Sequence, residues 1–360
     1  MDINRFLSYM VEKDASDLFF SPNAPVLLKV HNESRPINPD KVLSAEEVKD
    51  MAYSMLNMEH IDKFEKSYEL NAGVTIEDIG RFRVSLLKQR SEVAMVIRLI
   101  HTQPPTVEEL NLPLILKDQV NERRGLILIA GATCSGKSST MAAMINHRNE
   151  SQHGHILTIE DPLEYLHSYK KCIVNQRELG IDTHSYNDAL KNAIREAPDV
   201  ISIGEIRDVD TMKSAITFAE TGHLCIATIH ASNCIETLDR ALNFFPESSH
   251  HQVLMDLSRN LSSVVCQRLI KGQKILWPAI ELLTNSPYIQ DLIQRGDFDS
   301  IQQAIARRDQ DDAITFDSSL IELYSLGRIS KEAAIEHADS KHNMTVQLRL
   351  LDERRTKKAI

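Results

Sequence analysis

The sequence has no apolar run long enough to cross a bilayer and no N-terminal secretory signal. A membrane-spanning helix needs roughly 20 consecutive apolar residues, whereas the longest run here, at residues 126–130, has the length of a strand. The chain starts Met-Asp-Ile-Asn-Arg-Phe, which lacks the basic and then apolar pattern of a signal peptide. We therefore expect a cytoplasmic chain with no transmembrane segment, which reaches any membrane only through a partner.

Cysteine and positive charge are also scarce. The five cysteines are odd in number and form no Cys-x-x-Cys pair, which argues against a disulfide framework or a structural zinc site and favours a reducing compartment. The formal net charge of -10 provides no overall basic surface for nucleic acid. We therefore expect no nucleic-acid partner, although a locally basic channel stays open as an alternative.

Glycine and proline, at 12 residues each, are too few for a low-complexity chain, and the sequence has no internal repeat. Its 360 residues are 42% hydrophobic and 26% charged, which is typical of a folded protein with enough length for two cores. Residues 1–100 mix strand-like and helix-like segments, and we expect them to form an α+β N-terminal domain. Two adjacent prolines within residues 101–108 stop the last strand and stiffen the connection, so this segment is predicted to be a linker.

The pattern changes at Gly125 into short apolar runs that are separated by helix-like segments. Continuous apolar runs are typical of strands buried on both faces of a parallel sheet. Their alternation with helices predicts a doubly wound α/β domain over residues 109–285. We expect helices in the C-terminal region, residues 286–360, and also over residues 254–269, with one strand pair near residues 276–283. The predicted parallel strands are residues 126–130, 155–159, 200–203 and 224–229.

A P-loop pattern directly follows the first of these strands and directly precedes a helix-like segment, which is the context that the motif requires. Backbone N–H groups of such a loop bind phosphates, Lys137 reaches the β- and γ-phosphate oxygens, and the Ser138 hydroxyl binds Mg²⁺. A chance match is the alternative, which this context disfavours. We predict that ATP binds to Gly131, Ala132, Thr133, Cys134, Ser135, Gly136, Lys137, Ser138 and Ser139.

Acidic residues follow two other predicted strands, at the edge where open α/β sheets place their chemistry. Glu160, Asp161 and Glu164 come after the second strand. One of these carboxylates is expected to orient or deprotonate the attacking water, and which of them is the base stays open. Glu205 follows the third strand as in a Walker B segment, where it would hold or orient Mg²⁺ and the water. The alternatives are a solvated acidic loop and an ordinary turn, and a neighbouring P-loop disfavours both.

Two histidines and two arginines complete the set of candidate residues. His223 and His230 bracket the strand at residues 224–229, and their spacing does not suit a metal site. His230 is expected near the γ-phosphate, with a purely structural role as an equally weighted alternative. Arg83 and Arg98 lie on predicted N-terminal strands. Strand arginines are commonly solvated or paired, but in a ring they can reach the ATP of a neighbouring subunit.

Four motifs, in this order, resemble the secretion-type hexameric ATPases that drive type IV pili and type II secretion. Residues 131–138, 159–164, 203–208 and 221–230 correspond to that family's Walker A, Asp box, atypical Walker B and His box. Over essentially its whole length the chain resembles the pilus retraction branch, PilT and PilU. Its ending, Thr315-Phe-Asp-Ser-Ser-Leu with His337-Ala-Asp-Ser340, is more similar to PilU than to PilT. It has no four-cysteine insert of the kind that the pilus assembly branch carries.

The resemblance implies a PAS-like N-terminal domain and a RecA-like ATPase domain. It also implies a homo-hexameric ring on the inner face of the bacterial inner membrane, beneath the pilus platform protein. The site residues that it implies are Lys137 and Ser138 for ATP and Mg²⁺, Glu160 as base, Glu205 as Walker B acid, His223 and His230 as the His-box pair, and Arg83 and Arg98 as arginines that act on a neighbouring subunit.

The chain departs from the family pattern in two places. Cys134 stands where relatives usually have glycine, and Tyr288-Ile-Gln-Asp-Leu-Ile-Gln-Arg295 replaces the motif that PilT uses for retraction. The second departure favours a PilU-like accessory to a PilT-type ATPase over a primary PilT-type motor. Two further alternatives are a RecA-like nucleic-acid motor and a ring subunit that binds ATP without hydrolysing it. The acidic balance argues against the first, and the full set of acids argues against the second.

Overall fold

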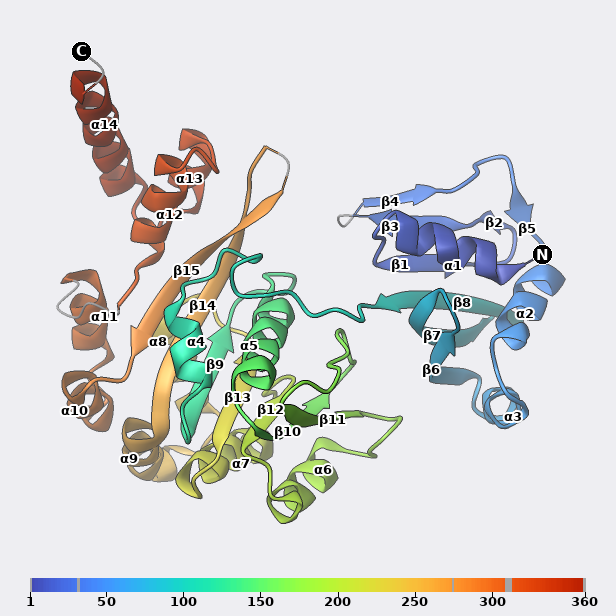
Figure 1. The fold of residues 1–360 in the computed structure, drawn as a ribbon, viewed down its shortest axis with the longest axis horizontal. Coiled ribbons are helices and arrows are strands. Elements are labelled where there is room, and N and C mark those ends of the chain that lie inside the picture. The colour runs from blue at the N-terminus through green and yellow to red at the C-terminus, as the bar shows by residue number, and fades with distance from the viewer. Residues whose placement is uncertain (1, 31–32, 274, 308–312, 359–360) are drawn as a thin grey trace. The chain divides into compact units, whose positions relative to one another are not determined.

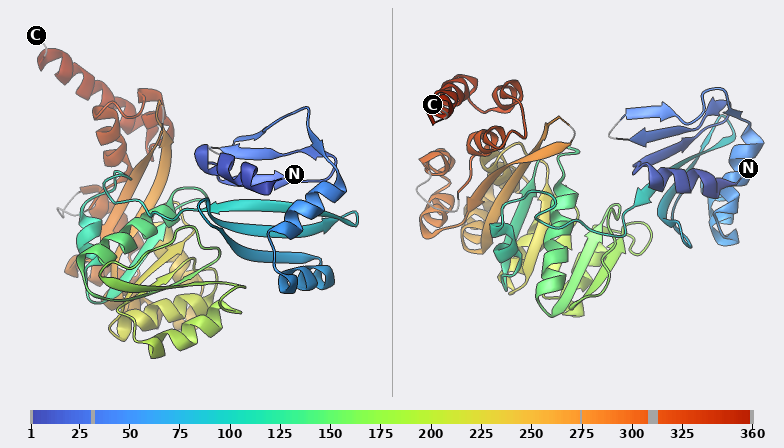
Figure 2. Two further views of the ribbon diagram at one scale, coloured as in Figure 1. Left: turned by 45° about the vertical axis from the view of Figure 1, so that its right-hand side comes forward. Right: turned by 45° about the horizontal axis from the view of Figure 1, so that its top comes forward.

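The computed structural model describes residues 2–30, 33–273, 275–307 and 313–358, and the chain divides into two compact units (Figures 1 and 2). The first unit comprises Met1–Gln103, Pro162–His167 and Glu178–His184, and the second comprises Pro104–Asp161, Ser168–Arg177 and Ser185–Ile360. The segment predicted to be a linker, residues 101–108, therefore contains the point where the chain first passes from one unit to the other.

The first unit is built on an antiparallel sheet of six strands in the order β4-β3-β1-β8-β7-β6. Alternate residues of β7 (Phe82, Val84 and Leu86) are buried in the core, which is the period of two that a half-buried strand requires. The elements are α1 (Ile3–Glu12), β1 (Asp17–Phe20), β2 (Ala24–Pro25), β3 (Leu27–Val30), β4 (Glu33–Pro36), β5 (Val42–Leu43), α2 (Ala45–Ser54), α3 (Met58–Ser67), β6 (Glu69–Ile76), β7 (Gly80–Gln89) and β8 (Glu92–Ile100).

The second unit contains a seven-stranded sheet in the order β11-β10-β12-β13-β9-β14-β15. Neighbours from β10 to β14 are parallel, and β15 pairs with β14 in the antiparallel sense. The elements are α4 (Ile115–Val120), β9 (Gly125–Ala130), α5 (Lys137–Ser151), β10 (Gly154–Glu160), β11 (Cys172–Glu178), α6 (Tyr186–Ala193), β12 (Val200–Ile203), α7 (Val209–Glu220), β13 (Leu224–Ile229), α8 (Cys234–Asn243), α9 (His250–Asn260), β14 (Leu261–Lys271) and β15 (Leu276–Thr284).

Both faces of this sheet are covered. Ile127 and Ile129 of β9 pack in one cluster with side chains of α4 and α5, whereas Leu126 and Leu128 pack in another with side chains of α7 and α8. Every residue of β9, β12 and β13 is buried. These strands therefore carry the continuous apolar runs from which a doubly wound sheet was predicted.

The prediction of a helix over residues 254–269 is wrong for the second half of that segment. α9 ends at Asn260, and β14 begins at Leu261 and lies between β9 and β15. Apolar and β-branched residues such as Val264 and Val265 suit a strand with a neighbour on each side. A short apolar run has no distinctive period, so its position in the sheet determines its structure.

Helices follow the sheet in the C-terminal region: α10 (Pro287–Arg295), α11 (Phe298–Arg307), α12 (Phe316–Ser325), α13 (Lys331–His337) and α14 (Lys341–Lys358). Local sequence sets the limits of α10, because the Ser286 hydroxyl accepts from the N–H of Ile289 and Gly296 ends the helix with φ +69°. Among the described residues, no helix combines the length and the hydropathy that a bilayer span requires.

Candidate active site

Four neighbouring strands of the second unit end at the same edge of its sheet. Ile159 pairs with Ile203, Ile203 with Ala227, and Ile229 with Ala130. The residues at the ends of these strands are therefore brought together, and they include the P-loop, Glu160, Glu205 and His230. The sequence placed all four at strand ends, and the register shows that the strand ends are adjacent.

The P-loop lysine is held by its own loop. Lys137 begins α5 and is 9% exposed, and its Nζ donates to the carbonyl oxygens of Gly131 (2.9 Å) and Ala132 (2.8 Å). Gly136, just before the helix, has φ +89°, a left-handed conformation that favours glycine. The start of α5 has no side-chain cap, so its N–H groups suit an anion.

The loop lies too close to β14 for larger residues. A Cβ at Gly131 would lie 2.3 Å from Ser135 Oγ and 2.6 Å from the backbone oxygen of Gln267, and one at Gly136 would lie 2.7 Å from Gln267 Nε2. Ser135 Oγ is buried and has no hydrogen-bond partner within the described chain. A narrow glycine-bounded loop with a lysine and an unsatisfied hydroxyl fits a phosphate chain.

Gln267 is a residue that the sequence analysis missed. It lies on β14, and its Oε1 accepts from the Thr140 hydroxyl of α5 at 2.6 Å, with both side chains buried. This bond fixes the helix that starts at the P-loop against the sheet. No local motif marks Gln267, because its segment was expected to be helical.

Cys134 is the exposed residue at the tip of the P-loop and has φ +61°. Left-handed backbone of this kind favours glycine. The structure therefore gives a reason why glycine suits this position better than a residue with a Cβ.

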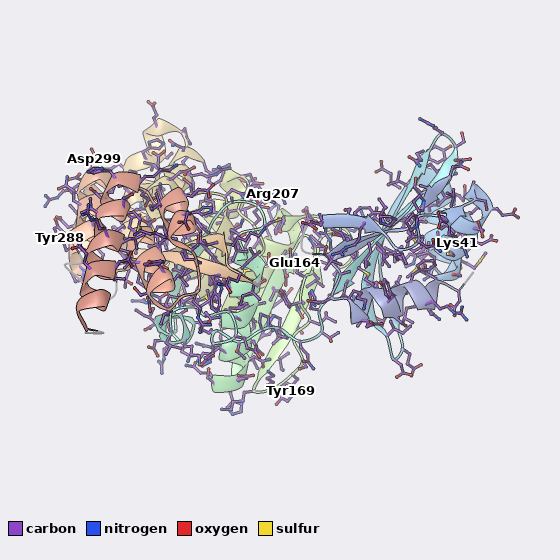
Figure 3. All side chains as sticks on the ribbon, turned by 90° about the horizontal axis from the view of Figure 1, so that it is seen from above. Lys41, Glu164, Tyr169, Arg207, Tyr288 and Asp299 are labelled. Atoms are coloured by element: carbon purple, nitrogen blue, oxygen red, sulfur yellow. The ribbon has the colours of Figure 1, made fainter. Side chains whose placement is uncertain are left out.

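Glu205 and His230 form the centre of the site. Glu205 Oε1 lies 2.8 Å from His230 Nε2, and the other carboxylate oxygen accepts from Arg207 Nε and lies near Arg207 Nη2, each at 2.7 Å. Arg207 Nη1 also reaches Asp161 Oδ2 at 3.5 Å. Arg207, labelled in Figure 3, was not among the predicted site residues. Arg207 lies two residues after Glu205, so its proximity to that acid could have been predicted from the sequence. Its contact with Asp161 could not, because the fold brings these two residues together.

Glu160 ends β10 beside this group. Its Oε1 accepts from the Thr158 hydroxyl at 2.7 Å and from Gln176 Nε2 at 3.4 Å. A Cβ at Gly204 would lie 3.1 Å from the Cα of Glu160, so this glycine permits the close approach of the two strand ends. Burial raises the pKa of the adjacent Tyr186, and the nearby Asp161 carboxylate adds to that rise.

His223 lies at the other edge of the same sheet. It precedes β13, whereas His230 follows it, and a strand of six residues spans about 20 Å. His223 Nδ1 lies 3.0 Å from Thr221 Oγ1 and 3.2 Å from the Phe218 carbonyl oxygen. One subunit therefore does not bring the two histidines together.

The remaining predicted residues belong to the first unit. Arg83 and Arg98 are paired directly across β7 and β8. Arg98 Nε donates to Asp17 Oδ1 at 2.8 Å, and Arg83 Nη1 lies 3.8 Å from Glu178 Oε1. Burial raises the pKa of Glu178, and Arg83 opposes that rise. Glu164, labelled in Figure 3, accepts the N–H of His101 through its backbone oxygen at 3.1 Å.

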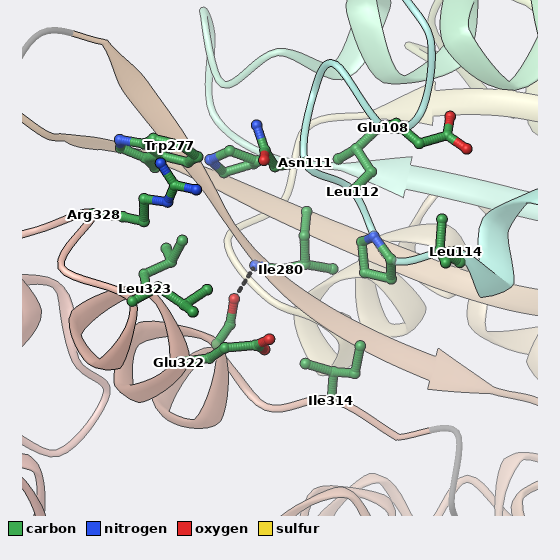
Figure 4. Close-up of a pocket in the computed structure, with 14 residues that line it drawn as sticks. Glu108, Asn111, Leu112, Leu114, Trp277, Ile280, Ile314, Glu322, Leu323 and Arg328 are labelled. Atoms are coloured by element: carbon green, nitrogen blue, oxygen red, sulfur yellow. Dashed lines mark hydrogen bonds between the residues drawn. The ribbon is translucent and has the colours of Figure 1, made fainter.

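A separate pocket of about 450 Å³ lies in the second unit (Figure 4). Its apolar wall includes Leu112 and Leu323, and the Arg328 guanidinium lies 4.4 Å from the centre of the Trp277 ring. It shares no lining residue with the P-loop or with the Glu205 and His230 pair. We therefore do not assign nucleotide binding to this pocket.

Comparisons with known proteins agree with this geometry. The model of the type II/IV secretion system protein family matches residues 1–286. The chain is 44% identical to the type IV pilus ATPase PilU of Pseudomonas aeruginosa, over 98% of this chain and 93% of that protein. It is 37% identical to the type IV pilus retraction ATPase PilT of the same organism, over 95% of this chain and 100% of that protein.

A solved structure covers both units as well. The crystal structure of the pilus retraction motor PilT with bound ADP aligns with a TM-score of 0.87 and 34% identity, over 95% of this chain and 98% of that chain. The predicted fold class, an N-terminal α+β domain, a RecA-like domain and C-terminal helices, is confirmed by this likeness.

Proposed function

Because the chain belongs to the type II/IV secretion system protein family, we propose that it is an ATP-hydrolysing motor for type IV pilus retraction and twitching motility. The observation that carries the proposal is the sheet edge where the P-loop, Glu160, Glu205 and His230 lie at the ends of four neighbouring strands. Support comes from the identity to PilU and from the ADP in the PilT structure. We assign ATP binding and hydrolysis to the second unit.

ATP supplies the phosphoanhydride bond that breaks, and Mg²⁺ neutralises charge on its phosphates. Lys137 would exchange its two loop carbonyls for phosphate oxygens, and Ser138 and Glu205 would hold the metal. Glu160 orients the attacking water and accepts its proton. His230, at hydrogen-bonding distance from Glu205 Oε1, fixes the orientation of that carboxylate.

We propose that six copies form a ring in which Arg83 and Arg98 of one subunit face the nucleotide of the next. Both side chains have an acidic neighbour in their own unit, Glu178 and Asp17 respectively. A guanidinium whose orientation is already restricted loses less freedom on meeting phosphate, and its planar fork suits that ligand. His223 is the remaining predicted site residue and lies at the opposite edge of the sheet from His230. In the proposed ring, His223 would act at the nucleotide of a neighbouring subunit.

The motor acts, in this proposal, at the inner face of the bacterial inner membrane beneath the pilus platform protein, as an accessory to a PilT-type ATPase. The identity of 44% to PilU against 37% to PilT supports the accessory role. So does α10, where Tyr288 is 53% exposed on the helix that replaces the PilT retraction motif. Figure 3 shows Tyr288 on this C-terminal region.

Substitution of Glu205 tests the hydrolytic assignment. Loss of a group that orients metal and water lowers turnover by about 100-fold or more, so Glu205→Ala should bind ATP but turn it over at no more than about 1% of the normal rate. The control is Glu247→Ala, which removes an exposed glutamate of the same unit. Unchanged turnover in Glu205→Ala would remove the assignment, and strong stimulation by DNA or RNA would favour a nucleic-acid motor instead.

Retraction in cells tests the accessory role. Pili should retract when this protein and a PilT-type partner are both present, and should not retract when the partner alone is deleted. Retraction without the partner would show a primary motor.

A further inference from the structure

The loop that carries His230 is tied to the C-terminal region by one arginine. After His230 the chain turns at residues 231–233 into α8, whose N-cap Asn233 accepts from the N–H of Glu236 at 2.7 Å. In this turn between His230 and α8, the carbonyl oxygen of Ser232 accepts a hydrogen bond from Arg268 Nη2 at 3.2 Å. Ser232 is only two residues from His230, so Arg268 constrains the loop close to that histidine.

Arg268 uses its other donors on a segment about 70 residues away in sequence. Its Nη1 donates to the carbonyl oxygen of His337 at 3.1 Å and to Asp339 Oδ1 at 2.8 Å. Its guanidinium carbon lies 3.7 Å from the centre of the Phe316 ring, which is fully buried. A planar fork that hydrogen-bonds at its edge and stacks on its face specifies one arrangement of three segments.

The segments held by Arg268 are those that carry the PilU-like ending. Phe316 and Asp317 belong to Thr315-Phe-Asp, and His337 and Asp339 belong to His-Ala-Asp-Ser. Asp317 Oδ1 in turn accepts from the N–H of Asp339 at 3.0 Å, which joins the two motifs. The ending of the chain therefore packs around the arginine that contacts the His230 loop.

We propose that Arg268 is a positioning residue for hydrolysis, and that it couples the His230 loop to the segment from Phe316 to Asp339. This inference rests on the proposed ATPase function. Any shift of His230 when nucleotide binds would displace Ser232, and Arg268 would transmit that displacement to Asp339 and α13. The reverse also holds, so a partner that binds the C-terminal region changes the position of His230.

Arg268→Lys tests the proposal in the full-length protein. Lysine keeps the charge but cannot serve Ser232, His337 and Asp339 together while stacking on a ring. We expect kcat to fall by about tenfold, which corresponds to the loss of one hydrogen bond to a charged group, while affinity for labelled ADP changes by less than about twofold. Amide hydrogen exchange should show that nucleotide no longer alters protection of α13.

Two further variants keep the test decisive. Asp339→Asn leaves Arg268 in place and removes one charged acceptor, so its effect should have the same pattern and a smaller size. Arg349→Lys is the matched control, because Arg349 is exposed on α14 and pairs with Glu353 on its own helix, at 3.2 Å. It should behave as the unmodified chain.

The outcomes separate this inference from the proposed function. Failure of the unmodified chain to bind or hydrolyse ATP would overturn the proposed function. Normal hydrolysis in both Arg268→Lys and Asp339→Asn, with nucleotide-dependent protection of α13 retained, would overturn the coupling alone. A less stable C-terminal region with unchanged kcat would also overturn it, because Arg268 would then act only in packing.

Discussion

One added methyl group at Gly131 tests whether the P-loop depends on its contact with β14. In Gly131→Ala the new Cβ would lie 2.3 Å from Ser135 Oγ and 2.6 Å from the backbone oxygen of Gln267. Ser135 can rotate away, but the Gln267 oxygen belongs to a strand that pairs with β9 and β15 on its two sides. We therefore expect the added methyl group to displace the P-loop and to leave β14 in place.

The size of the effect follows from that geometry. An extra methyl group in a closely packed site costs about 1–3 kcal/mol, so we expect the free energy of unfolding to fall by about 2 kcal/mol. Displacement of the loop also removes N–H contacts to phosphate. Two such bonds to a charged ligand are worth about 3 kcal/mol, so nucleotide affinity should fall by about 100-fold.

Urea unfolding and fluorescence titration with labelled ADP measure these two quantities. The control is Gly222→Ala, since Gly222 has φ +98° and a Cβ there meets no atom within 4 Å. It should cost about 1 kcal/mol in backbone strain and leave ADP affinity unchanged. Equal affinity in Gly131→Ala and Gly222→Ala would refute the argument that the β14 contact shapes the loop.

Two other predictions use single side chains. A thiol-alkylating reagent should modify only Cys134 in the native protein, because the other four cysteines are buried. The adduct in the P-loop should block ATP binding. Full ATP binding by a protein whose modification at Cys134 is confirmed by mass spectrometry would contradict this prediction. Burial raises the pKa of Glu281, so the native protein loses stability as pH rises from the unfolded pKa, near 4.5, through the raised folded value. Glu281→Gln should therefore gain stability relative to the unmodified chain as pH rises above about 4.5. A difference in urea unfolding that does not change with pH would show that the carboxylate is not desolvated.

The sequence predicted the parallel strands, because a continuous apolar run marks each of them. The four continuous apolar runs are β9, β10, β12 and β13. Glu205 and His230 could be placed at strand ends because parallel strands end at one edge. Their contact at 2.8 Å could not be predicted, since it depends on the order in which the strands are arranged.

Two of the residues that were missed, Gln267 and Arg268, have partners that are distant in sequence. Gln267 contacts Thr140, and Arg268 contacts Ser232 and Asp339. Both lie on β14, a segment that was expected to be helical and that pairs with β9 and β15 in the sheet. Side chains on such a strand acquire a role from the fold, so no motif marks them.

The two predicted histidines lie too far apart in one chain to act at the same nucleotide. Lys137, Glu160, Glu205 and His230 gather at one edge of the sheet, whereas His223 lies at the other edge, about 20 Å away. If His223 contributes to hydrolysis, it must do so at the nucleotide of another subunit or through the strand between the histidines. Mixing His223→Ala chains with Lys137→Ala chains separates these cases. Activity restored in mixed rings, above that of either variant alone, requires action between subunits, and no restoration at any ratio would leave His223 a role only within its own chain.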